Sequence, residues 1–97
     1  MASVKDLKKD IDLLMSLVLN DCFYVIEYNS KVEKDAVMEL AKEALLQHRE
    51  FRKRVNHPDA KDDSKKVKQY YNELMEEVMN TVNEDLEKLS AEVKKAA

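Results

Sequence analysis

Two histidines and many carboxylates are the residues of this 97-residue chain whose types suit metal binding. A di-iron helical bundle needs Glu-x-x-His pairs, which bring both side chains to one helix face. The residues three positions before His48 and His57 are instead Leu45 and Arg54, and the His-Glu-x-x-His pattern of zinc proteases does not occur. The sequence therefore predicts no metal centre and no other cofactor.

The remaining candidates for chemistry are two aspartates and a cysteine. Asp21 and Asp85 border or interrupt apolar stripes, and we expect each to lie at the solvent boundary or to accept a hydrogen bond, with Thr81 as a partner for Asp21. Cys22 is the only cysteine, so it forms no internal disulfide and is best interpreted as a small core residue. We expect His48 to be a neutral imidazole bonded to a tyrosine hydroxyl or a backbone carbonyl. No nucleophile–base pair emerges, and the sequence predicts no enzyme.

The complete lack of glycine excludes several kinds of binding loop. P-loops, dinucleotide-binding turns, nucleophile elbows and EF-hand loops each place glycine where the backbone takes a positive φ or approaches a ligand closely. The chain has no Gly and one Pro, and 38% of its residues are charged while only 6% are aromatic. Strong helix formers make up much of the rest, which predicts an all-α fold.

Apolar residues recur every three or four positions and predict three long helices, over residues 3–28, 31–55 and 64–94. The expected core positions are Val4, Leu7, Ile11, Leu14, Val18, Cys22 and Val25, then Val37, Leu40, Ala44, His48, Phe51 and Val55, and finally Val67, Tyr71, Leu74, Val78, Val82, Leu86, Leu89 and Val93.

Local signals set the expected ends of these helices. Asp6 follows Ser3 by three positions, and Glu33 follows Ser30 by three positions. This pattern of a serine and an acidic residue is typical of a capping box. Pro58 ends the second helix. Because short connections force neighbouring helices to run antiparallel, we expect residues 1–97 to form one domain, an up-down-up three-helix bundle.

The first helix has more apolar surface than one core seam requires. Leu13, Leu17, Tyr24 and Tyr28 form a second strip beside its main face. Either this helix is the most buried of the three, or the strip faces a partner, since contiguous exposed apolar patches usually mark interfaces. The second alternative predicts a small non-enzymatic protein-interaction module that binds another protein or forms a homodimer through the first helix.

Charge is distributed unevenly along the chain, but it does not indicate a nucleic-acid or membrane partner. The formal net charge is −3, whereas nucleic-acid modules are normally basic overall. The basic cluster over residues 49–68 alternates with acids, and its cations at the end of the second helix complement the helix dipole. No apolar stretch approaches the ~20 residues needed to cross a bilayer. With one cysteine and a mixed-charge N-terminus, we expect a cytoplasmic protein.

One loop suggests a second function. Asn56-His57-Pro58-Asp59 follows a basic helix and precedes another helix. This arrangement resembles a J-domain, a family of chaperone regulators in which a His-Pro-Asp tripeptide joins two antiparallel helices. The resemblance extends over residues 45–78 and implies that the tripeptide and the preceding basic helix engage a heat-shock ATPase. The long first helix and Asn56 before the histidine depart from the family pattern. A J-domain-like chaperone regulator is therefore the alternative function.

Overall fold

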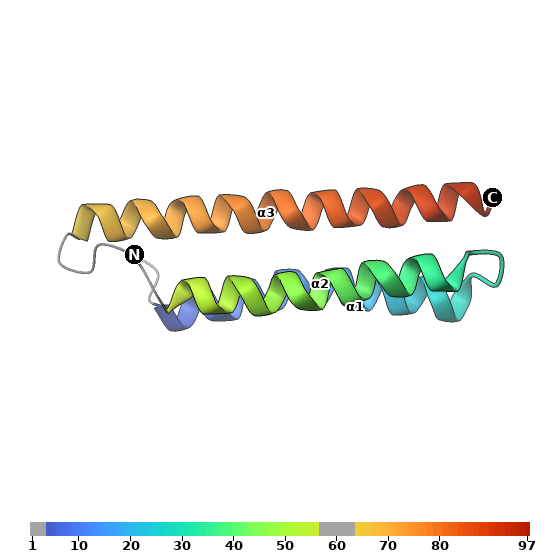
Figure 1. The fold of residues 1–97 in the computed structure, drawn as a ribbon, viewed down its shortest axis with the longest axis horizontal. Coiled ribbons are helices and arrows are strands. Elements are labelled where there is room, and N and C mark those ends of the chain that lie inside the picture. The colour runs from blue at the N-terminus through green and yellow to red at the C-terminus, as the bar shows by residue number, and fades with distance from the viewer. Residues whose placement is uncertain (1–3, 57–63) are drawn as a thin grey trace.

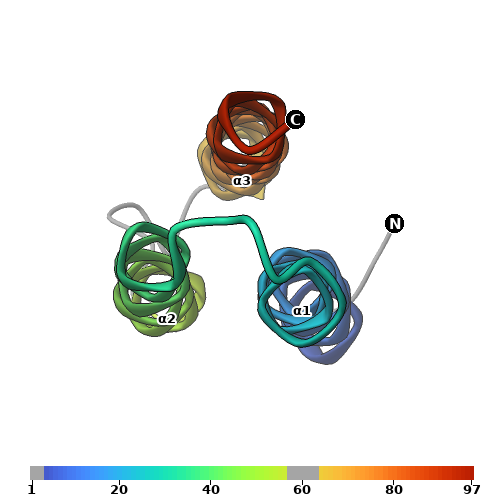
Figure 2. The ribbon, with the colours of Figure 1, turned by 90° about the vertical axis from the view of Figure 1, so that its right-hand side faces the viewer.

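Three helices make up almost all of the structure, a computed structural model that describes residues 4–56 and 64–97. They are α1 (Val4–Tyr28), α2 (Lys34–Val55) and α3 (Ser64–Lys95). Figure 1 shows that α1 and α3 run in one direction and α2 in the other. The end-on view of Figure 2 places the helices at the corners of a triangle, and each helix packs against both others. The predicted all-α, up-down-up three-helix bundle is confirmed.

The second helix begins later than the sequence predicts. It starts at Lys34 rather than at residue 31, because Glu33 has an extended backbone and its side chain makes no capping hydrogen bond. The Asn29 side chain instead accepts a hydrogen bond from the Lys31 backbone N–H at 3.1 Å, which closes a local turn. This turn lets Val32 bury its side chain at the end of the core. The expected capping box at the start of α2 is therefore wrong.

The core runs along the axis of the bundle between the three helices. Its buried members are Ile11, Met15, Val18, Cys22, Val32, Val37, Ala41, Ala44, Phe51, Val55, Leu74, Val78, Val82 and Leu89. Most were predicted, with two shifts of one residue: Met15 is fully buried where Leu14 was expected, and Ala41 is buried beside a half-buried Leu40. Adjacent residues of a helix lie about 100° apart around its axis. Which of the two is buried depends on where the neighbouring helices pack.

Two tyrosines of α3 fasten the end of α2. Tyr70 donates a hydrogen bond to the carbonyl oxygen of Arg54 at 2.8 Å, and Tyr71 donates one to that of Val55 at 3.0 Å. The last carbonyls of a helix have no partner within the helix, so these hydroxyls satisfy groups that water would otherwise have to reach. The contact also fixes the level at which α3 packs along α2.

Candidate functional site

The second apolar strip of α1 lies on the surface of the bundle. Leu13, Leu17, Tyr24 and Tyr28 are 64%, 47%, 63% and 69% exposed. At about 100° per residue, all four fall within about 60° of the helix circumference, well away from the buried positions. The bundle itself therefore does not cover these four side chains. We refer to these four residues as the α1 strip.

The α1 strip combines an aliphatic half with an aromatic half. Tyr24 and Tyr28 lie one helical turn apart, with ring centroids separated by 4.7 Å and ring planes inclined at 41°. Neither hydroxyl has a hydrogen-bond partner among the residues that the structure describes. The rings thus offer a broad apolar surface with two free polar tips. Such amphipathic rings suit an interface that is dry at its centre and wet at its edge.

Further large apolar side chains are exposed outside the α1 strip, and the sequence analysis did not single them out. They are Phe23, Met38, Leu45, Leu46 and Met79. Val4 was an expected core position, but its side chain is 39% exposed at the start of α1, so that expectation is wrong. Phe23 is about 100° away from Tyr24 around α1 and therefore does not continue the strip. Leu45 and Leu46 are adjacent apolar residues off the core stripe of α2, a pattern that could have revealed them. Isolated exposed apolar residues are normal on protein surfaces.

His48 contacts a carboxylate of the first helix. Its Nε2 atom lies 2.6 Å from Oδ1 of Asp12, and the Arg52 Nε atom is 3.5 Å from the same oxygen. The expectation of a tyrosine or backbone partner is wrong, because the hydroxyl of Tyr71 is engaged by α2 itself. The three side chains are partly exposed and link α1 to α2 at the surface. Their role is consistent with holding the two helices in register.

The basic end of α2 also contributes to packing. Arg54 pairs with Glu77 of α3 at 2.7 Å, and its guanidinium lies 5.9 Å from the centroid of the Phe51 ring. The hydrogen bond to Glu77 raises the pKa of Arg54, and the same contact lowers the pKa of Glu77. The last turns of α2 carry four cations, which are Arg49, Arg52, Lys53 and Arg54. Two of them, Arg52 and Arg54, form ion pairs with acidic residues of the other two helices.

A buried carboxyl group interrupts the core. Asp85 is only 3% exposed, and its Oδ2 atom has no hydrogen-bond partner. A hydrogen bond with the Gln47 side chain of α2 lowers the pKa of Asp85. The Oε1 atom of Gln47 is buried without a partner, and its Nε2 atom donates to Glu43. Burial raises the pKa of Asp85, with Glu43 and Glu84 adding to the effect and Lys88 opposing it. Asp85 therefore does not border solvent, which was the first of the two expectations, while its hydrogen bond with the Gln47 side chain agrees with the second.

Cys22 lies in the same region of the core. It is fully buried, and burial raises the pKa of its thiol, with a further contribution from Asp21 and Asp85. A raised pKa keeps the sulfur protonated and unreactive. The structure confirms the interpretation of Cys22 as a core residue, while Asp21 is exposed as expected and makes no hydrogen bond to Thr81 among the described residues.

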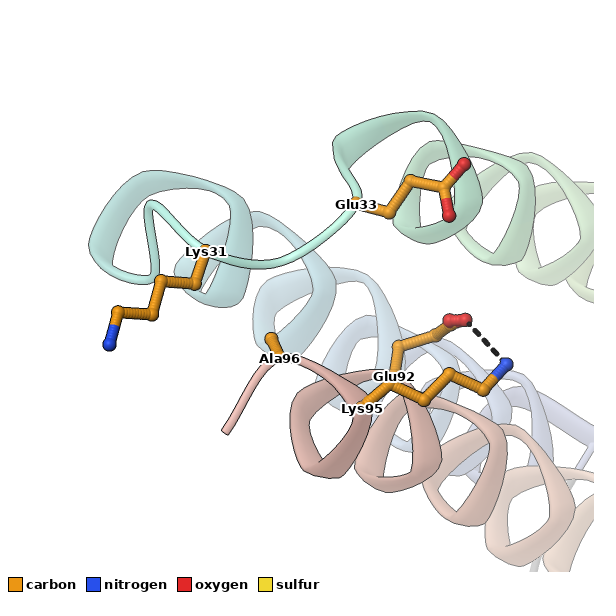
Figure 3. Close-up of a pocket in the computed structure, with 5 residues that line it drawn as sticks. All are labelled: Lys31, Glu33, Glu92, Lys95 and Ala96. Atoms are coloured by element: carbon orange, nitrogen blue, oxygen red, sulfur yellow. Dashed lines mark hydrogen bonds and ion pairs between the residues drawn. The ribbon is translucent and has the colours of Figure 1, made fainter.

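A small hollow lies at the end of the bundle where α1 connects to α2. Lys31, Glu33, Glu92, Lys95 and Ala96 line this hollow of about 170 Å³. Figure 3 shows Glu92 and Lys95 joined by an ion pair, at 3.3 Å, while Lys31 extends away from the other side chains. The charged groups do not converge on one point. The hollow therefore has no arrangement that would hold a reacting group.

The comparisons add no match. No protein-family model matches the chain, and no curated protein or solved structure is significantly similar to it.

Within residues 4–56 and 64–97, no three histidine, cysteine or carboxylate side chains cluster as metal ligands. None of the helices in that part of the chain has both the length and the apolar character to cross a bilayer. His57, Pro58 and Asp59 lie outside the described residues.

Proposed function

We propose that this chain is a small cytoplasmic protein-interaction module without catalytic activity, which self-associates through the α1 strip. The observation that carries the proposal is the exposure of four large apolar side chains on one face of one helix. Exposed apolar surface that is contiguous usually marks a site of association. A single, buried thiol suits a reducing compartment.

A second copy of the chain is the partner that we favour. The face of a straight helix is convex, and it packs well against another helix of the same kind. Pairing of one patch with its own copy forms a closed two-fold dimer, which is the commonest form of homo-oligomer. Leu13 and Leu17 then supply the aliphatic part of the interface, and the two tyrosines supply rings whose hydroxyls stay in contact with water.

Sedimentation equilibrium tests the proposal with one variant and one matched control. Leu17→Glu places a charge in the centre of the α1 strip, and a charge buried without a partner costs several kcal/mol. Leu46→Glu makes the same change at a side chain of α2 that is 63% exposed. We expect a dimer for the wild type and for Leu46→Glu, and a monomer for Leu17→Glu. A wild type that stays monomeric at high micromolar concentration would refute self-association.

The J-domain-like function is the second candidate. One observation favours it: α2 and α3, which flank residues 57–63, run antiparallel and pack together (Figure 1). Arg49 and Lys53 on α2 make no ion pair with the described residues, and they would remain available to a partner. Binding in this case would involve α2 and the loop rather than the α1 strip, so Leu17→Glu would leave it unchanged.

A further inference from the structure

The four residues of the α1 strip are centred between Asn20 and Asp21, and the pair of Leu13 and Tyr24 is centred two residues earlier. Leu13 and Tyr24 lie at equal distances from the point between Val18 and Leu19, and Leu17 lies close to that point. A two-fold axis through this point, perpendicular to the helix, would bring Leu13 of one strip onto Tyr24 of another and would leave the two copies of Leu17 close together. The layout therefore suits a pair of antiparallel helices.

Charged residues on one edge of the strip repeat this symmetry. Lys9 and Glu27 are eighteen residues apart, which is about five whole turns at 3.6 residues per turn, so they share one edge of α1. Their midpoint is Val18. Both side chains are exposed, and neither forms an ion pair with the residues that the structure describes. Each is therefore a charge of α1 that the bundle itself does not neutralise.

The opposite edge carries a second complementary pair. Asp10 and Tyr28 are also eighteen residues apart, and their midpoint is Leu19. Both are exposed, and the Tyr28 hydroxyl has no hydrogen-bond partner among the described residues. A hydroxyl of this kind can donate to a carboxylate. The pair of Leu13 and Tyr24 and both polar edges thus indicate the same centre to within one residue.

We propose that two copies of the chain pair α1 against α1 in antiparallel orientation, centred at Val18 and Leu19. This inference rests on the proposed self-association and adds its geometry. Leu13 contacts the partner's Tyr24, and Leu17 lies beside the partner's Leu17 at the two-fold axis.

The same rotation brings each edge of α1 onto the same edge of the partner helix. Lys9 therefore pairs with the partner's Glu27, and Tyr28 donates a hydrogen bond to the partner's Asp10. Each of these contacts occurs twice. A parallel pair would place Glu27 at the level of the partner's Glu27, and no cation of α1 would lie at that level. Charge complementarity therefore favours the antiparallel pair, since complementary charges fix the register of an interface.

Charge reversal tests the register. Lys9→Glu and Glu27→Lys each place like charges at two symmetric positions, and we expect the dissociation constant of the dimer at low salt to rise about tenfold in each variant. The double variant restores opposite charges, so its dissociation constant should return to within about threefold of wild type. Lys94→Glu, an exposed change at the end of α3, is the matched control and should leave the dimer unchanged.

Cysteine cross-linking tests the orientation independently. In the antiparallel pair the two copies of residue 17 are offset by only about 4.5 Å along the helix, whereas the two copies of residue 13 are offset by about 16 Å. Leu17→Cys should therefore form a covalent dimer under mild oxidation, and Leu13→Cys should not, because a disulfide needs Cα atoms within about 7 Å. Efficient cross-linking of both variants would indicate a parallel pair and overturn this inference.

The outcomes separate the two proposals. A wild-type dimer whose double charge variant remains as weak as the single variants would overturn the Lys9–Glu27 register, while self-association through the α1 strip would stand. A wild type without dimer would overturn both proposals. Rescue in the double variant together with selective cross-linking at residue 17 would support the antiparallel pair.

Discussion

Asp85→Asn should make the bundle more stable at neutral pH. The carboxyl group is 3% exposed, and its Oδ2 atom faces the core without a hydrogen-bond partner. The Asn side chain has nearly the same shape, carries no charge and can donate a hydrogen bond to the unpartnered Oε1 of Gln47. A buried polar group without a partner costs about 1–3 kcal/mol, so we expect a gain of about that size. This is a large part of a typical stability of ~5–15 kcal/mol.

The gain should depend on pH in a defined direction. Burial raises the pKa of Asp85 above its ordinary value of 3.8, so the folded state binds a proton more tightly than the unfolded state. Between the two pKa values the stability of the wild type therefore falls as the pH rises, and the full penalty applies above the folded pKa. Below pH 3.8 both states are protonated and the penalty disappears. The advantage of the Asn variant should be largest at neutral pH and shrink on acidification.

Urea unfolding of both proteins at about pH 7 and about pH 4 measures this difference directly. Glu87→Gln is the matched control, because it also removes one acidic charge from α3 but at an exposed position. We expect the control to change the free energy of unfolding by less than about 0.5 kcal/mol. If Asp85→Asn lowers the stability at neutral pH, the carboxylate is stabilised as an anion and the reasoning fails. A gain that does not change with pH would also contradict it.

Two further predictions concern the core and the loop. Leu74→Ala should lower the free energy of unfolding by about 2–5 kcal/mol, because Leu74 is only 1% exposed. Leu14→Ala should lower it clearly less, because Leu14 is half-buried. Equal losses of the two variants in urea melts would contradict the assignment of the core. If the chain has the J-domain-like function, it should stimulate the ATPase of a cognate heat-shock chaperone and His57→Gln should abolish the stimulation. A wild-type chain without effect in that assay would remove this alternative.

The number, order and approximate length of the helices could be predicted from the sequence. Without glycine and with one proline, the chain has few residues that interrupt a helix, and apolar residues recur with helical spacing throughout. The end of α2 at Val55 and the start of α3 at Ser64 agree with the prediction. The start of α2 does not agree, because it depends on the burial of Val32 at the end of the core, and a capping pattern contains no information about that contact.

The rotation of α1 about its own axis was decided only by the tertiary structure. Helical spacing allows a core stripe through positions 11, 14 and 18, and it equally allows one through positions 11, 15 and 18. The sequence therefore cannot decide whether Leu14 or Met15 is buried. Packing against α2 and α3 together buries Met15, and the same rotation leaves the α1 strip in solvent.

The meeting of Asp85 with Gln47 was also invisible in the sequence. The two residues are far apart along the chain, and their contact depends on the level at which α2 and α3 pack. Local spacing therefore determined the helices and which residues are candidates for a surface strip. Contacts between helices decided which candidates face water and which polar groups are confined in the core, because burial is a property of the assembled bundle rather than of any one helix.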